Sequence, residues 1–152
     1  MKKKYEKTNK QYQKAIKTIP LATQTTSKSA ANFVKGAYPL FLEKGKGGEV
    51  WDIDGNKYID YILGLLPIVL GYQDSEVDKA IKNQLKKGIS FSLATTLETT
   101  LSELLTKLIP SAEMVRFAKT GSDVTTGSIR LARAYTGRDK IALCGYHGWH
   151  DW

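Results

Sequence analysis

The feature that most constrains the fold is a break between an apolar run and a helical pattern at Thr120-Gly121-Ser122. Residues 114–118 form a short apolar run typical of a buried strand, and residues 122–136 place apolar side chains at helical spacing before Gly137. A second apolar run follows at 140–144. Strand, tight turn, helix and strand in about 30 residues form a βαβ unit. We therefore predict an α/β chain with parallel strands.

Composition is that of a globular protein, because 41% of the 152 residues are hydrophobic and 25% are charged. The net charge of +8 is spread along the chain without a nucleic-acid-binding motif, so we interpret it as a solvated surface. Nucleic-acid binding stays open as an alternative, which predicts strongly salt-dependent affinity.

Several features favour a cytoplasmic protein that does not bind membranes. Cys144 is the single cysteine, which excludes an internal disulfide and fits a reducing compartment. The first 18 residues are basic and polar, without the apolar stretch of a secretory signal. The longest apolar run, 62–70, contains a glycine and a proline and is too short to span a membrane.

The rest of the chain predicts a helix, a strap, a hairpin and two more helices. A loose helix is expected to end at Pro20, and a polar Ser/Thr-rich strap follows it. Alternating apolar residues on both sides of Asp54-Gly55-Asn56 predict a hairpin. We expect a helix from Ser75, acting as its cap, to about Lys87 and another over 97–108. The second carries a leucine stripe that we expect to be buried: Leu97, Leu101, Leu104, Leu105 and Leu108.

The residues at the 120–123 break suit a phosphate group. A helix N-terminus presents unpaired N–H groups and partial positive charge. Gly121 lets the backbone approach an oxygen closely, and the hydroxyls of Thr120 and Ser122 can add donors. Asp123 would repel an anion, so its role is better explained by capping the helix or orienting another group. The alternative is that Ser122 or Asp123 is simply an N-cap. The pattern matches neither a dinucleotide fingerprint nor a Walker loop.

The segment GYHGWHDW at 145–152 follows the second predicted strand, where ligands of parallel sheets bind. A flat ligand could stack on Tyr146 or Trp149, and His147 could form a hydrogen bond or transfer a proton. The alternatives are aromatic side chains that pack under a loop, and a metal held by His147 and His150 with Asp151. We predict no metal site. A phosphate site after one strand and an aromatic platform after the next indicate a planar phosphorylated cofactor, with pyridoxal 5'-phosphate (PLP) as the obvious candidate.

From about Ile19 to Trp152 the chain resembles the N-terminal portion of class III PLP-dependent aminotransferases, most closely the glutamate-1-semialdehyde 2,1-aminomutase-like branch. Three segments carry the resemblance in order and spacing: GKGGEVWDIDGNKYIDYI, SAEMVRFAKTGSDVTTGSIRLARAYTGRDKI and GYHGWHDW. The resemblance implies the fold-type I PLP-transferase fold. Residues 1–70 would be the helix, strap and hairpin of the small domain, and 71–152 would begin the large cofactor domain with its first βαβ portion.

The resemblance also implies roles for individual residues. Thr120, Gly121 and Ser122 would receive the cofactor phosphate, and Tyr146 would stack on its ring. Asp123 and His147 would not touch the cofactor but would support the residues that do. Such enzymes are usually homodimers, and their partners are a small-molecule amino donor and a carbonyl acceptor.

The sequence departs from the family pattern in ways that bear on the substrate. Lys119 stands where asparagine is frequent and Asp123 where glutamate is frequent, and both changes leave the backbone of the phosphate site intact. Members that act on glutamate 1-semialdehyde carry an upstream arginine for the substrate carboxylate, whereas residues 23–39 contain none. This segment is more similar to relatives in amino-sugar or polysaccharide synthesis.

No lysine in the chain matches the family's Schiff-base lysine, and no acid matches the group that holds the pyridinium nitrogen. We therefore expect an N-terminal piece of a longer enzyme, which contains no catalytic residue and is inactive alone. Two alternatives remain, an authentic glutamate-1-semialdehyde 2,1-aminomutase and a non-catalytic domain that binds a phosphorylated ligand.

Overall fold

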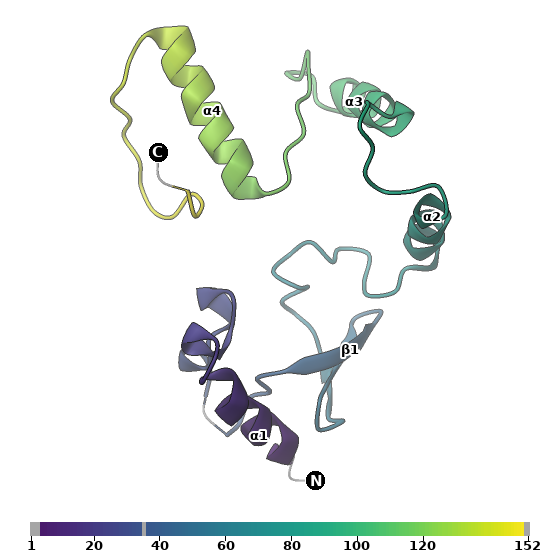
Figure 1. Cartoon of the computed structure of the whole chain (residues 1–152), viewed down its shortest axis with the longest axis vertical. Coiled ribbons are helices and arrows are strands. Elements are labelled where there is room, and N and C mark those ends of the chain that lie inside the picture. Colours follow the sequence, from purple (N-terminus) through teal and green to yellow (C-terminus); the bar gives the residue numbers. More distant parts are fainter. Residues whose placement is uncertain (1–3, 35, 151–152) are drawn as a thin grey trace. The chain divides into compact units, whose positions relative to one another are not determined.

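The computed structural model describes residues 4–34 and 36–150, which form two compact units, Met1–Ile89 and Ser90–Trp152 (Figure 1). The first unit contains α1 (Glu6–Ala15), β1 (Leu42–Lys46), β2 (Glu49–Asp52), β3 (Lys57–Ile59) and α2 (Ser75–Leu85). Between α1 and β1 lie three short 3₁₀ turns, Pro20–Ala22, Thr26–Lys28 and Ala30–Asn32. The second unit contains α3 (Thr96–Leu108) and α4 (Gly121–Thr136).

The three strands form an antiparallel sheet in the order β1-β2-β3. Val50 lies opposite Tyr58 and Trp51 opposite Lys57, which confirms the predicted hairpin around Asp54-Gly55-Asn56. Gly55 adopts a φ of 85°, a left-handed conformation that a tight turn requires and glycine permits. The sheet therefore follows directly from the alternating pattern and the turn residues.

Two aspartates tie the hairpin to α1. Asp52 is 1% exposed, and its carboxylate accepts hydrogen bonds from Tyr58 Oη and from the N–H groups of Asp54 and Asn56. Asp54 then accepts from the N–H groups of Lys7 (2.7 Å) and Thr8 (2.9 Å) in the first turn of α1. The hairpin turn thus supplies the acceptors that the start of α1 lacks.

A loop of apolar residues after β3 is closed by a tyrosine. Tyr72 pairs with Gly47 through two backbone hydrogen bonds of 2.8 Å, and its hydroxyl donates to Asp60 Oδ2 at 2.7 Å. The hydrogen bond to Asp60, together with burial, raises the pKa of Tyr72 to about 12. The ring lies so close to Gly45 that a Cβ there would stand 2.5 Å from it. Glycine at position 45 is therefore required by this contact.

In the second unit, the chain returns alongside α4 after the helix ends (Figure 1). Gly137 ends α4 in the left-handed conformation, with φ 67°, as the sequence predicts. Residues 141–144 then run beside the helix and share a hollow with Thr125, Ser128 and Ile129. This path carries residues 145–150 back toward the first turn of α4.

Four local expectations are wrong. Residues 114–118 and 140–144 are not strands, because no described residue offers either segment the ladder of hydrogen bonds that defines one. None of the leucines in the stripe of α3 is buried: Leu105 is half-buried and the other four are exposed, with Leu101 46% accessible in the described chain. Asp74 rather than Ser75 caps α2, since its carboxylate accepts from the N–H groups at 76 and 77. The first helix ends at Ala15, well before Pro20.

No helix in the described part of the chain is both long enough and apolar enough to cross a membrane.

Candidate functional site

The start of α4 is organised by a capping box. Thr120 is the N-cap residue, and its extended backbone (φ −133°, ψ 161°) delivers the chain into the helix at Gly121. Its hydroxyl accepts from the N–H of Asp123 at 3.2 Å, while the Asp123 carboxylate accepts from the N–H of Thr120 at 2.9 Å. Neither Ser122 nor Asp123 is therefore the N-cap, because the helix begins one residue earlier than the apolar pattern indicates.

The capping box leaves two N–H groups open. Those of Gly121 and Ser122 form no hydrogen bond with any residue that the structure describes, as expected of the first positions of an α-helix. A Cβ at Gly121 would meet no atom within 4 Å, so the space beside this backbone is open. The macrodipole of the 16-residue helix adds partial positive charge at the same point. This arrangement can bind an anion.

Asp123 is compatible with an anion at this end because its carboxylate is turned back toward the cap. One oxygen accepts from the N–H of Thr120, and the other lies 3.6 Å from Nε2 of His150. Negative charge on Asp123 is thereby engaged by groups of the chain itself. The sequence predicts that this carboxylate would repel a phosphate, and these contacts reduce that repulsion.

The loop 145–150 lies against this first turn. The N–H of Trp149 donates to Ser122 Oγ at 2.9 Å, and the His150 ring reaches Thr126 Oγ1 at 3.2 Å through Nδ1. The Tyr146 side chain is 80% exposed, so a face of its ring is available. The structure therefore brings the segment that carries Tyr146 to the helix start that carries Gly121 and Ser122.

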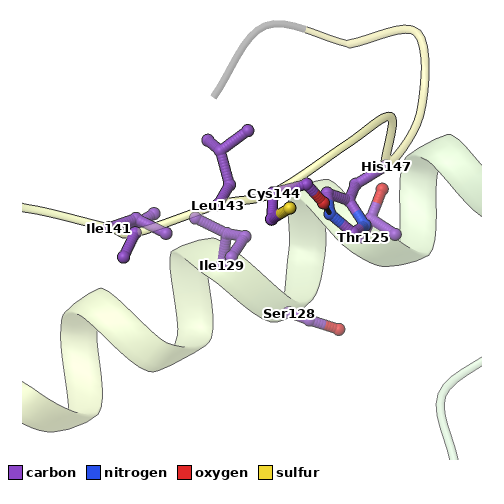
Figure 2. Close-up of a pocket in the computed structure, with 8 residues that line it drawn as sticks. Thr125, Ser128, Ile129, Ile141, Leu143, Cys144 and His147 are labelled. Atoms are coloured by element: carbon purple, nitrogen blue, oxygen red, sulfur yellow. Dashed lines mark hydrogen bonds between the residues drawn. The ribbon is translucent and has the colours of Figure 1, made fainter.

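His147 lies apart from these contacts. Its Nε2 is in hydrogen-bond contact with the backbone carbonyl of Cys144, within the turn that leads into the loop. Figure 2 shows the ring between this turn and Thr125, at the edge of a hollow of about 480 Å³. Aliphatic side chains such as Ile129 and Ile141 line most of that hollow, so it is a packing space rather than an anion site. Among the described residues no cluster of three possible metal ligands occurs, and Asp151 of the metal alternative lies outside them.

Thr126 and Gly148 were not identified from the sequence as parts of the site, and His150 was considered only as a possible metal ligand. Thr126 and His150 join the loop to the helix, and Gly148 makes the close approach between them. The capping box itself is visible as Thr-x-x-Asp, a spacing that identifies Thr120 as the cap. No local signal pairs the loop with the helix, because the contact joins residues 24 or more positions apart.

The profile of class III aminotransferases matches residues 30–151. The chain belongs to this family. It is 55% identical over 122 residues to 3-aminobutyryl-CoA aminotransferase of Cloacimonas acidaminovorans, which covers 80% of this chain and 30% of that protein. It is 46% identical over 119 residues to glutamate-1-semialdehyde 2,1-aminomutase of Persephonella marina, covering 76% of this chain and 28% of that protein. The chain thus spans less than a third of these relatives.

Solved structures confirm the predicted fold-type I class. An omega-transaminase from Sphaerobacter thermophilus superposes with a TM-score of 0.86 at 29% identity, covering 96% of this chain and 34% of that one. A transaminase with PLP bound gives a TM-score of 0.87 at 29% identity, covering 98% and 34%. Class III aminotransferases are PLP-dependent, which confirms the cofactor predicted from the sequence.

Proposed function

We propose that the chain is the N-terminal part of a PLP-dependent enzyme that transfers an amino group between a small-molecule donor and a carbonyl acceptor. The observation that carries the proposal is the pair of open N–H groups at Gly121 and Ser122, next to a loop that carries an exposed tyrosine. A homodimer, a cytoplasmic location and a boundary near residue 70 between small and large domains belong to the same proposal.

The residues present fit the phosphate of PLP. Two N–H groups of one helix turn point to the same side, and a dianion there is stabilised by both hydrogen bonds and the macrodipole. The hydroxyl protons of Thr120 and Ser122 remain available as donors, because both oxygens act as acceptors in their hydrogen bonds with Asp123 and Trp149. These residues would hold the phosphate, while Tyr146 would lie against the ring.

When bound, PLP supplies an electron sink that stabilises the carbanion formed as an amino group is transferred. The residues of this chain hold and orient it rather than exchange protons. Asp123 keeps Thr120 in its cap geometry, and His147 fixes the turn at Cys144 that precedes Tyr146. Both would thus act through their neighbours. We place the covalent lysine in a part of the enzyme beyond this chain.

The names of the relatives indicate two classes of substrate. The 55% identical relative acts on 3-aminobutyryl-CoA by its name, and this favours a β-amino acyl thioester as substrate. The aminomutase relatives favour glutamate 1-semialdehyde, but residues 23–39 lack an arginine for its carboxylate. The amino-sugar assignment depends on the same segment alone. Assaying the full-length enzyme with all three substrate classes separates them, and rapid formation of 5-aminolevulinate would establish the aminomutase.

The proposal is tested by Gly121→Val in the full-length enzyme, with Gly127→Ala as the matched control. A valine side chain would enter the space that the phosphate needs, whereas position 127 lies six residues further along the same helix and is equally open. Loss of two charge-assisted hydrogen bonds predicts at least about a 100-fold weaker PLP affinity. The control should bind normally. Cofactor absorbance and apoenzyme melting temperature are the measurements.

Equal PLP affinity in Gly121→Val and Gly127→Ala would contradict the proposed phosphate site. A non-catalytic phosphate-binding domain is the remaining alternative. It predicts that the complete gene encodes no Schiff-base lysine, which its sequence decides.

A further inference from the structure

The loop 145–150 touches α4 at three successive positions. Gly148 approaches the helix, Trp149 donates its N–H to Ser122 Oγ at 2.9 Å, and His150 reaches Thr126 Oγ1 at 3.2 Å. Three consecutive contacts on one helix face make this a docked segment, although Trp149 itself is 81% exposed. The docking is therefore made by backbone and polar groups, and not by burial of the aromatic ring.

Gly148 shows how close the approach is. A Cβ at this position would stand 3.0 Å from both Ser122 Oγ and Thr125 Oγ1, and 3.2 Å from the Ser122 Cα. Its φ of 127° is also a conformation that other residues rarely adopt. Space and backbone conformation both require glycine here, so the loop fits the helix in one specific arrangement.

His150 provides the side-chain anchor of the loop. Its two ring nitrogens face different residues of α4, Nδ1 toward Thr126 and Nε2 toward Asp123 at 3.6 Å. The first distance is a hydrogen bond, and the second is a longer electrostatic contact. Asp123 also belongs to the capping box, so the ring connects the loop to the same group that shapes the helix start.

We propose that His150 is a positioning residue, which holds the Tyr146 loop on the first turn of α4 before the cofactor binds. This inference depends on the proposed function, because it assigns the loop a role in binding PLP. An undocked loop would have to be ordered at the moment of binding, and the conformational entropy lost in this step would reduce the affinity. A docked loop already holds the segment that carries Tyr146 on the first turn of α4, so less order has to be created when PLP binds and the affinity is higher.

The experiment compares His150→Ala, His150→Asn and, as the matched control, Ser128→Ala in the full-length enzyme. The asparagine amide can reproduce the contact of Nδ1 with Thr126, whereas alanine removes both contacts. Ser128 lies on the same helix, and among the described residues its hydroxyl bonds only to the carbonyl of Val124. Amide hydrogen exchange of residues 145–150 is measured in the apoenzyme, and PLP affinity is measured separately.

We expect His150→Ala to speed exchange in this segment roughly fivefold and to weaken PLP affinity by a similar factor, since one lost hydrogen bond is about 1 kcal/mol. His150→Asn should restore most of both, and Ser128→Ala should match the wild type. Wild-type exchange and affinity in His150→Ala, or equal losses in the alanine and asparagine variants, would overturn the inference. Normal behaviour of His150→Ala combined with loss of binding in Gly121→Val would refute this inference alone. Normal binding in Gly121→Val would contradict the proposed phosphate site, on which this inference depends.

Discussion

The first turns of α1 and α4 both present N–H groups without a partner inside the helix, and the two helices differ in what these groups bind. At α1 the N–H groups of Lys7 and Thr8 donate to the carboxylate of Asp54, an anion supplied from the hairpin 47 and 46 positions away. At α4 the N–H groups of Gly121 and Ser122 have no such partner among the described residues. The start of α1 is thus filled by a carboxylate of the chain itself, whereas the start of α4 is open to an anion from outside.

The units that contain the two helix starts also differ in how many of their described residues are buried. Every residue that the structure describes as buried lies in Met1–Ile89, including Thr8, Val50 and Asp52. In Ser90–Trp152 the described apolar side chains remain at least partly accessible, as in the stripe of α3. The polar and apolar side chains that are buried in the first unit thus pack against residues of the same unit. The second holds its site through local capping and a docked loop.

The largest expected effect is that of Asp52→Ala, which removes the acceptor on which the hairpin turn depends. Four hydrogen bonds from Asp54, Asn56 and Tyr58 lose their partner in a buried position. We expect the local free energy of unfolding to fall by at least about 3 kcal/mol. Amide exchange over residues 49–59 of the full-length enzyme measures it. The exposed Glu43→Ala is the control, and similar exchange in the two variants would refute this role of Asp52.

Asp54→Ala should have the next largest effect, because it empties the start of α1. Loss of a carboxylate at a helix N-terminus is about 1–2 kcal/mol, seen as faster exchange of the amides at Lys7 and Thr8. Asp54→Asn keeps one acceptor oxygen and should lose less. If the alanine variant leaves α1 unchanged, the two helix starts do not differ in the way described.

Thr120→Ala should weaken the start of α4 by about 1 kcal/mol in the apoenzyme, since the N–H of Asp123 loses its acceptor. The measurement is amide exchange in residues 120–126, with Ser128→Ala as the control on the same helix. Bound PLP should reduce the difference between Thr120→Ala and the wild type, because the anion orders the same turn. An equal difference with and without PLP would argue against an anion at this position.

Acid should produce the smallest effect, confined to α1. Burial of Asp54 acts to raise its pKa, but the hydrogen bonds from Thr8 and Lys7 outweigh it, so that the pKa lies below the ordinary 3.8. The stabilisation is therefore complete above pH 3.8 and is lost as the pH falls through the lowered pKa. Exchange at Thr8 should rise over that range in the wild type and stay flat in Asp54→Asn. A flat wild-type profile would contradict this account.

The sequence predicts the elements whose signals are local. The hairpin follows from alternation around Gly55, and α4 follows from its periodic pattern and the glycine at 137. The phosphate site at Gly121 and Ser122 and the platform at Tyr146 stay predictions from sequence, supported by the family and by the geometry of α4. The sequence cannot predict that Asp54 reaches α1 or that His150 reaches Thr126, because both depend on contacts between distant segments.

The predicted strands at 114–118 and 140–144 show a second limit of prediction from sequence. Apolar runs mark segments that can be strands, but a strand forms only when neighbouring backbone supplies its hydrogen bonds. The same reason explains the stripe of α3, since periodicity identifies the face that can be buried but not the surface that covers it. At these positions the apolar pattern therefore shows which segments can form a strand or be buried, but not whether they do so in the folded chain.

The most direct test is a crystal structure of the full-length enzyme with PLP, in which the distances from the phosphate oxygens to the backbone nitrogens of Gly121 and Ser122 are measured. We predict hydrogen bonds of about 2.7–3.2 Å to both nitrogens, with the ring against Tyr146. A phosphate held elsewhere, with these two N–H groups bonded to the protein or to water, would contradict the proposed role of α4.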